Sequence, residues 1–476
     1  MTGYAQLLPE ILLLAGALLA LFGEWLPGRD RGAAFIGAAL ALAAALAAAY
    51  SVLGDTLFGG LLYFDAPSRF IRVGVALLTA LWLLWFADRP IAGERSREAV
   101  ALVMFSATGA VLVAVCADLI TLFMALELST MPAYVLMGYR RRDARGLEGA
   151  LKYFLLSMLT SLIMLYGLSF LYGISGSTMF NEIALALPGA GTLALVAAVL
   201  TFVGVFAKLS AAPFHFWAPD AYAGAPAASV AFVSTVPKLA GAAVMVRLAQ
   251  AVAPGVPQLG SVVMIVAAAS IVLGNLAALS QRDLKRMMAY SGVAHAGYQL
   301  IALAAAITMV GLPSVGNGFV AVLFYALAYA IPSMAIMFVV AEEGDAIEDL
   351  AGLSERRPAA AWGIFVLLLS LVGIPPLAGF FGKLYLLGAG LDASMAWLVI
   401  VAVLGSVVSV GYYFRIVRAM FFDAPQTHET TTSEDLAEKP SAPICSWPSS
   451  LAFAIAVLVS IALGIGAAPV LGFLGL

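Results

Sequence analysis

The sequence predicts an all-α polytopic membrane protein with about fourteen transmembrane helices. Three observations lead to this fold class. Of the 476 residues, 63% are hydrophobic and only 11% are charged, whereas soluble domains have roughly 45–50% apolar and about 25% charged residues. The mean hydropathy is +1.03. The apolar runs are continuous and about 20 residues long, which suits a helix crossing a bilayer and not the alternating pattern of a β-barrel.

The apolar runs follow one another along the whole chain with short polar connections. Such runs satisfy their own backbone in hydrocarbon only as helices. The longest polar connection, residues 423–447, is rich in Thr, Ser, Pro and Glu and is typical of a loop. The predicted spans are 4–26, 32–53, 70–87, 98–115, 117–138, 150–172, 191–219, 224–250, 260–279, 287–309, 316–341, 358–389, 393–421 and 449–471.

The basic residues predict the orientation of these spans. With the N-terminus outside, eighteen of the 24 Lys and Arg fall in or beside cytoplasmic connections, and only Arg69, Arg72 and Arg247 lie near the outer face. This is the bias of the positive-inside rule. We therefore expect a multi-pass protein of a bacterial inner (plasma) membrane with both termini in the periplasm. The eighteen residues are Arg29, Arg31, Arg89, Arg95, Arg97, Arg140, Arg141, Arg142, Arg145, Lys152, Arg282, Lys285, Arg286, Arg356, Arg357, Arg415, Arg418 and Lys439.

Two of the predicted spans are irregular. Pro213 lies in the seventh span, and Pro375 and Pro376 lie in the twelfth. Proline removes a backbone donor and clashes with the preceding turn, so both helices are expected to break inside the membrane. The two spans are five apart and run in opposite directions, which indicates two inverted five-helix repeats with a working site at the midplane.

The repeats define the expected domain organisation of the chain. Residues 1–97 hold three N-terminal transmembrane helices, and residues 98–250 and 260–421 are the first and second five-helix repeats. A cytoplasmic polar loop at 422–448 then leads to a C-terminal transmembrane helix at 449–476.

Four ionisable residues lie deep in apolar spans: Glu127, Lys208, Lys238 and Lys383. Each central charge costs roughly 2.5–3.5 kcal/mol. Four would cost about ten, comparable with the net stability of a typical domain. A static buried pair of Glu127 with one lysine is the alternative, but three lysines leave a surplus of amines. A lysine poised between its charged and neutral forms can accept and release protons, so we predict a proton-translocation role.

The helix breaks bring further groups within reach of the lysines. Lys208 precedes Pro213 by five residues and Lys383 follows Pro376 by seven, so freed carbonyls and water are expected near both amines. The tenth span carries a histidine that is a candidate proton relay, although an ordinary helix-contact role is the alternative. The candidate relay residues are His295, Tyr298 and Ser291.

The chain lacks the residues that a redox centre would need. Cys116 and Cys445 are the only cysteines, which excludes a disulfide framework and a cysteine-ligated cluster within this chain. The three histidines do not suggest a haem site, and no metal site is predicted. There is no basic patch with interleaved aromatics, so nucleic acid is not an expected partner, whereas the lipid bilayer is.

Three stretches carry a family resemblance. They are 206–226 (FAKLSAAPFHFWAPDAYAGAP), 284–298 (LKRMMAYSGVAHAGY) and 373–383 (GIPPLAGFFGK). They resemble signatures of the antiporter-like, proton-pumping membrane subunits of respiratory complex I, NADH:quinone oxidoreductase (NDH-1), and the resemblance covers nearly the whole chain. Lys383 and the motif around Trp217 are most similar to the subunit N group. Ala223 departs from the acidic residue of many members, so this position is given no role.

The resemblance implies a membrane-arm subunit that moves protons, coupled to quinone reduction in other subunits. Glu127, Lys208, Lys238 and Lys383 match the charged residues of the family's central hydrophilic axis, and His295 lies near it. Flavin, iron–sulfur clusters and quinone are then expected in partner subunits, with no cofactor in this chain. The expected partners are other membrane-arm subunits and, through them, the peripheral arm.

Two alternatives from other classes remain beside this expectation. One is a subunit of a stand-alone cation/proton antiporter of the same superfamily, and the other is a membrane scaffold without transport activity. Lys383 and the motif around Trp217 favour the complex I subunit over the antiporter. The cost of the intramembrane charges argues against the scaffold.

Overall fold

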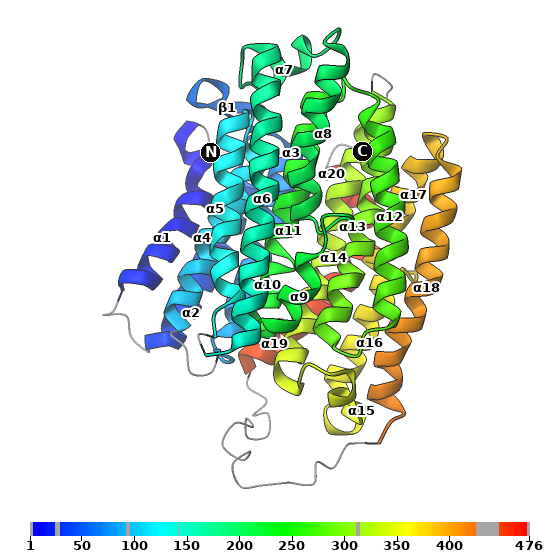
Figure 1. The fold of residues 1–476 in the computed structure, drawn as a ribbon. Coiled ribbons are helices and arrows are strands. Elements are labelled where there is room, and N and C mark those ends of the chain that lie inside the picture. The colour runs from blue at the N-terminus through cyan, green and yellow to red at the C-terminus, as the bar shows by residue number, and fades with distance from the viewer. Residues whose placement is uncertain are drawn as a thin grey trace.

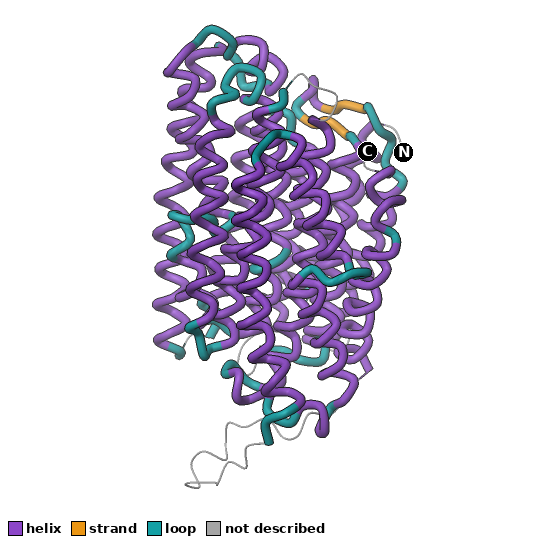
Figure 2. Tube along the Cα trace, turned by 90° about the vertical axis from the view of Figure 1, so that its right-hand side faces the viewer, coloured by secondary structure: helices purple, strands orange, loops and turns teal. Residues whose placement is uncertain are grey.

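The computed structural model describes residues 3–23, 29–91, 96–140, 142–310, 315–424 and 447–473. Long helices run side by side in one bundle, with a two-stranded antiparallel hairpin at one end (Figures 1 and 2). The elements are η1 (Gly3–Leu7), α1 (Leu8–Phe22), α2 (Arg29–Ala49), β1 (Asp55–Leu57), η2 (Phe58–Gly60), β2 (Leu62–Phe64), α3 (Ala66–Phe86), α4 (Ser96–Val115), α5 (Leu119–Met137), α6 (Ala144–Ser175), α7 (Phe180–Ala186), α8 (Gly191–Lys208), α9 (Trp217–Gly224), α10 (Ala227–Val233), α11 (Val236–Val252), α12 (Leu259–Leu279), α13 (Leu284–Thr308), α14 (Val315–Glu343), η3 (Ile347–Leu350), α15 (Leu353–Arg356), α16 (Pro358–Val372), α17 (Ala378–Asp392), α18 (Ala396–Phe421), α19 (Trp447–Ile465) and α20 (Ala467–Phe473).

Within the described residues, 12 helices are long and apolar enough to cross a membrane. Two predicted spans are not among them. The tenth corresponds to α13, a 25-residue helix that includes Lys285, Arg286 and His295. The twelfth is divided into α16 and α17, each of 15 residues. The all-α membrane fold class is confirmed, whereas the count of about fourteen spans and the inverted repeats stay predictions.

Acidic side chains define where several helices begin. Asp118 accepts hydrogen bonds from the first-turn amides of α5, and Asp143 and Asp283 do the same for α6 and α13. Asp65 and Ser68 form a reciprocal capping box at the start of α3. These side chains satisfy amides that have no partner inside the helix, so each span starts at a defined residue.

The chain leaves the helical conformation at both proline sites. Helix α8 ends at Lys208 and α9 begins at Trp217, with Pro213 between them. Helix α16 ends at Val372 and α17 begins at Ala378, and the two prolines of the twelfth span lie between these helices. Both breaks expose backbone groups that the next turn of helix would otherwise have satisfied.

A third break, which the sequence did not lead us to predict, separates α10 from α11. Ser234 and Thr235 connect the two helices, and Thr235 has a non-helical conformation (φ −125°, ψ −72°). Pro237 in the first turn of α11 has no amide hydrogen, and in a continuous helix its ring would clash with the carbonyl of the residue four positions earlier. Lys238 therefore also follows a helix break.

The centre of the bundle consists of α11, α13 and α14, whose residues are buried along almost their whole length. Helices α6, α12, α18 and α19 lie at the periphery and expose rows of large apolar side chains. Close packing relies on glycine: an added Cβ at Gly274 of α12 would lie 2.5 Å from the amide nitrogen of Ala294 on α13. Small residues allow such backbone contacts between membrane helices.

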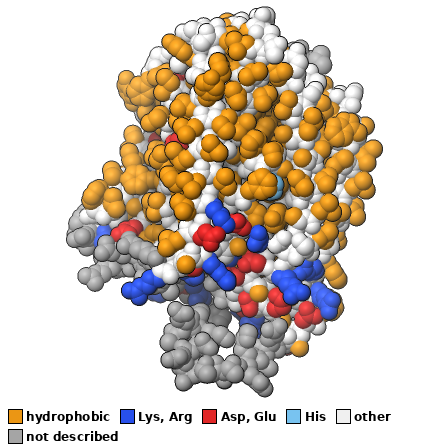
Figure 3. All heavy atoms as spheres, in the orientation of Figure 1, with side chains coloured by type: hydrophobic (Ala, Val, Ile, Leu, Met, Phe, Trp, Pro, Cys, Tyr) orange, Lys and Arg blue, Asp and Glu red, His pale blue; other side chains and the backbone are white. Residues whose placement is uncertain are grey.

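Charged side chains gather at the lower end of the bundle (Figure 3). Ion pairs there join Arg357 to Glu342 (2.6 Å) and Lys285 to Asp345 (2.7 Å). The opposite end, which holds β1 and α7 in Figure 1, contains the ion pairs of Arg72 and Arg247. This distribution agrees with the bias that predicted the topology. Which end faces the cytoplasm stays a prediction.

Candidate functional site

Glu127 and Lys208 form a buried ion pair between α5 and α8. Lys208 Nζ lies 3.3 Å from Glu127 Oε1, and both side chains are less than a tenth exposed. The lysine also donates to Thr130 Oγ1 at 3.2 Å and to Tyr134 Oη at 2.9 Å. Residues 127, 130 and 134 share one face of α5, because they are three and four positions apart. The amine is thus surrounded by acceptors.

The carboxylate of Glu127 has a further contact to α6. Ser161 Oγ donates to Glu127 Oε1 at 2.7 Å, so this oxygen accepts from both Lys208 and Ser161. Thr130 donates to the other oxygen at 3.4 Å. Freed carbonyls were expected near Lys208, but its amine contacts side chains of α5 instead. The break after α8 nevertheless places Lys208 at the last position of its helix.

Lys238 is buried without a hydrogen-bond partner for its amine among the described residues. The rings of Tyr222 and Tyr329 lie 5.6 and 5.8 Å from Nζ, close enough for cation–π contacts. A Cβ added at Gly292 of α13 would come within 2.8 Å of this nitrogen, so glycine leaves the space that the amine occupies. Lys238 is the lysine of the predicted axis with the fewest polar contacts.

His295 lies at the centre of a cluster of hydroxyl groups. Its Nδ1 is 2.7 Å from Tyr325 Oη, and its Nε2 is 3.3 Å from Tyr413 Oη. Tyr413 also lies 2.5 Å from Ser291 Oγ, one turn before His295 on the same helix face. The two ring nitrogens therefore connect hydroxyls of α14 and α18. This geometry suits a group that takes a proton on one side and releases one on the other.

Lys383 lies in α17, and its side chain reaches back to the second proline break. Its amine donates to the carbonyl oxygen of Val372, the last residue of α16, at 2.8 Å, and to Ser406 Oγ at 3.1 Å. A carbonyl freed by the break thus reaches Lys383. The amine also lies 4.7 Å from the ring centre of Tyr298, whose hydroxyl contacts Ser406 and Asn275.

The predicted site residues form hydrogen-bonded groups, two of which are linked through Tyr412, which hydrogen-bonds both Asn275 and Ser291. The groups surround the Glu127–Lys208 pair, His295, and Lys383. Lys238 lies between the first two. One neighbouring ring, Tyr329, is 4.6 Å centroid to centroid from His295. The other, Tyr222, contacts Trp217, and ring contacts continue from there through Tyr153 to Tyr134, which accepts a hydrogen bond from Lys208. The structure therefore places all the predicted ionisable residues in one row through the buried centre. Among the described residues, the amine of Lys238 has no hydrogen bond to the groups on either side of it.

The sequence did not single out the hydroxyl and amide side chains that contact the ionisable residues. Thr130 and Tyr134 could have been found from their helical spacing to Glu127. The others lie on different helices from the residue that they contact, and serine and tyrosine are too common in the chain to single out. The missed residues are Thr130, Tyr134, Ser161, Asn275, Tyr325, Ser406 and Tyr413.

Within the part of the chain that the structure describes, no group of three or more His, Cys, Asp or Glu side chains could hold a metal ion. Cys116 is buried and unpaired at the junction of α4 and α5. The amines, carboxylate, imidazole and hydroxyls of this row are groups that can hold and exchange protons, and this is the chemistry that the row supports.

Comparison with known proteins agrees with this fold. Residues 116–409 match the model of the NADH:quinone oxidoreductase/Mrp antiporter transmembrane family. NADH-quinone oxidoreductase subunit N of Sphingopyxis alaskensis is 37% identical over 91% of this chain and 92% of its own length. Subunit N of Maricaulis maris is 36% identical over 98% of this chain and 95% of its own.

Solved structures have the same fold as this chain. A chain of respiratory complex I from Thermus thermophilus superposes with a TM-score of 0.81 at 31% identity, covering 98% of both chains. A chain of the Mrp complex from Dietzia has a TM-score of 0.83 at 22% identity, covering 99% of this chain and 96% of its own, which shows a common fold. The chain therefore belongs to the NADH:quinone oxidoreductase/Mrp antiporter family of membrane proteins and, within it, to the subunit N family of NADH-quinone oxidoreductase.

Proposed function

We propose that this chain is a proton-translocating membrane-arm subunit of NADH:quinone oxidoreductase in a bacterial inner membrane. The buried Lys208–Glu127 ion pair beside the first helix break is the observation that carries the proposal. A pair held only for stability would need one lysine, whereas Lys238 and Lys383 continue the row beyond it. The names of the relatives support the assignment to this complex and not to a separate antiporter.

The proposed mechanism moves a proton in steps along the row. The opposite charge of Glu127, 3.3 Å from Lys208 Nζ, stabilises the ammonium group at the start of this sequence of steps. A change in that distance would weaken the stabilisation and release the proton toward Lys238. His295 and its tyrosines would then pass it toward Lys383, whose amine contacts the carbonyl at the end of α16. Aromatic rings between the groups would keep the steps separate.

Coupling to quinone reduction in partner subunits completes the proposal. Flavin, iron–sulfur clusters and quinone would belong to those partners, because this chain offers neither paired cysteines nor a haem site. Co-purification distinguishes the proposal from the antiporter alternative. The chain should leave detergent-solubilised membranes with flavin- and iron–sulfur-bearing subunits. Recovery with antiporter subunits alone would favour the alternative.

Substitution of Lys208 by arginine tests whether this residue titrates during turnover. Arginine keeps the positive charge next to Glu127, so the complex should assemble, but a guanidinium group does not release its proton in a protein. We expect Lys208→Arg to abolish proton pumping per NADH oxidised in vesicles with normal amounts of complex. Lys208→Ala should also abolish pumping, but it strands Glu127, so arginine is the decisive variant.

Lys152→Arg is the matched control for this experiment. Lys152 is exposed and pairs with Glu148 at 2.8 Å and Asp220 at 3.0 Å, and arginine can retain both contacts. This variant should pump normally. Full pumping by Lys208→Arg would mean that the pair is static and would remove the main support for the proposal.

A further inference from the structure

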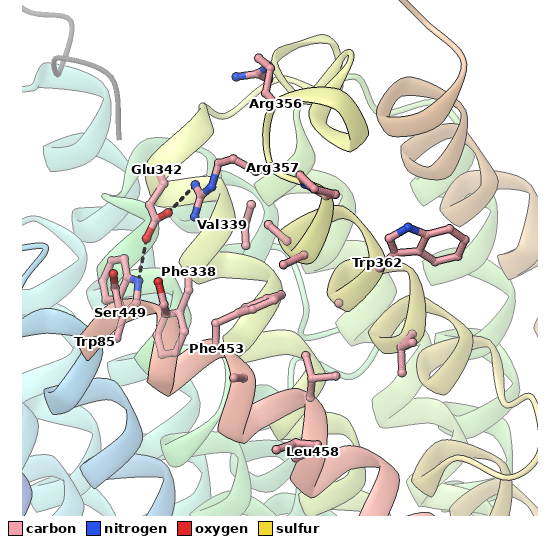
Figure 4. Close-up of a pocket in the computed structure, with 18 residues that line it drawn as sticks. Trp85, Phe338, Val339, Glu342, Arg356, Arg357, Trp362, Ser449, Phe453 and Leu458 are labelled. Carbon is pink, nitrogen blue, oxygen red and sulfur yellow. Dashed lines mark hydrogen bonds and ion pairs between the residues drawn. The ribbon is translucent and has the colours of Figure 1, made fainter. Parts of the chain in front are cut away.

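A large groove lies beside α19, away from the row of buried lysines. Its walls are α16 and α19, and the last turns of α3 and α14 close one end. The volume is about 1110 Å³. Most of the lining is apolar, with Phe453 and Leu458 of α19 along its length (Figure 4). An exposed apolar hollow of this size marks a binding site for an apolar group.

One end of the groove is charged. Arg357 Nη1 donates to Glu342 Oε2 at 2.6 Å and to Glu343 Oε1 at 2.9 Å. Trp85 Nε1 donates to the other oxygen of Glu342 at 3.3 Å, as Figure 4 shows. Arg356 also contacts Glu343, at 2.8 Å. These residues lie at the end of the bundle where basic side chains gather.

The charge that this end presents outward is positive. The side chains of Glu342 and Glu343 are only 6% and 4% exposed, whereas those of Arg357 and Arg356 are 22% and 42% exposed. The carboxylates are therefore covered by the guanidinium groups with which they pair. Trp362 at the rim is exposed, as expected for a tryptophan at a membrane–water interface.

We propose that this groove binds one anionic phospholipid. The phosphate lies at Arg356 and Arg357, and the acyl chains run between α16 and α19. A guanidinium group matches phosphate oxygens in geometry and charge, and basic pockets between membrane helices on the cytoplasmic side suit anionic headgroups. A lipid accounts for both ends of the groove, because it is itself charged at one end and apolar along the rest.

Ala454→Trp tests the proposal by filling the groove. Ala454 lines the groove and is exposed, so a larger side chain enters the hollow without displacing a packed neighbour. Ala462→Trp is the matched control: Ala462 is an exposed alanine of the same helix outside the groove. Native mass spectrometry would count the phospholipids retained by the purified intact complex after detergent washing.

We expect Ala454→Trp to lose one phospholipid per complex relative to wild type, and Ala462→Trp to lose none. After delipidation, wild type should rebind phosphatidylglycerol at least tenfold more tightly than phosphatidylethanolamine. If both variants retain the same number of phospholipids, the proposed site is wrong. If wild type binds the two lipids with equal affinity, the proposed selectivity for an anionic headgroup is wrong. A photoreactive residue in place of Ala454 gives a second measurement. A lipid adduct supports the proposal, whereas a polypeptide adduct or the lack of any lipid adduct overturns it.

Discussion

Lys208 and Lys238 should differ sharply in what they contribute to stability. Methionine has a similar length and no charge, so Lys→Met substitutions compare the amines directly. Removing Lys208 leaves the buried Glu127 carboxylate without its ion-pair partner, 3.3 Å away in wild type. Breaking a buried pair in this way costs about 3–5 kcal/mol. Lys208→Met should therefore be clearly destabilising.

Lys238→Met should be close to neutral. Its amine has no hydrogen bond among the described residues, and an unsatisfied buried polar group costs about 1–3 kcal/mol. Against this, the cation–π contacts at 5.6 and 5.8 Å contribute about 0.5–2 kcal/mol each. These terms nearly cancel, so we expect a change within about 1 kcal/mol. The gap of at least about 2 kcal/mol between the two variants corresponds to roughly 30-fold in an equilibrium constant.

Two assays are needed. Denaturation of the purified complexes is monitored by the release or unfolding of this chain, and proton pumping is measured in vesicles. Lys238→Met should match wild type in stability and yet fail to pump, which separates a functional from a structural role. Equal destabilisation by Lys238→Met and Lys208→Met would refute the reasoning from their contacts. Normal pumping by a stable Lys238→Met complex would remove Lys238 from the proposed axis.

Three further predictions concern other parts of the chain. For topology, impermeant thiol reagents added to sealed cells should label Ser175→Cys and not Thr430→Cys; residue 430 lies outside the described residues. The reverse labelling pattern would show that the orientation is opposite to the predicted one. The isolated chain should show no flavin, haem or iron–sulfur spectrum and should not oxidise NADH; a stoichiometric chromophore would contradict this. Burial raises the pKa of Asp283 above its ordinary value. At pH values above the ordinary pKa, burying the ionised carboxylate therefore costs stability. The cost disappears below pH about 4, where the carboxyl is protonated in both the folded and the unfolded state. Because asparagine also caps helices, Asp283→Asn should raise the denaturation temperature slightly at pH 7, with the gain disappearing toward pH 4; a loss of stability at pH 7 would contradict the reasoning.

The sequence alone determined the class of the protein and the identity of its unusual residues. Helix length and hydrophobicity are local properties, so continuous apolar runs predicted the spans without knowledge of their neighbours. Glu127, Lys208, Lys238 and Lys383 were conspicuous because charge is rare in such runs. The prolines of the seventh and twelfth spans predicted two helix breaks, because proline acts on its own preceding turn. Pro237 carried the same signal for the third break and was not interpreted in that way.

Only the tertiary structure decided what each of these residues contacts. Lys208 meets a glutamate 81 positions earlier, whereas Lys238, equally buried, meets aromatic rings and no acceptor. The groove beside α19 combines side chains from α3, α14, α16 and α19, which no local pattern connects. Contacts between helices depend on how the faces of separate spans are rotated and packed. The free energy that determines this packing is shared among many residues distant in the chain.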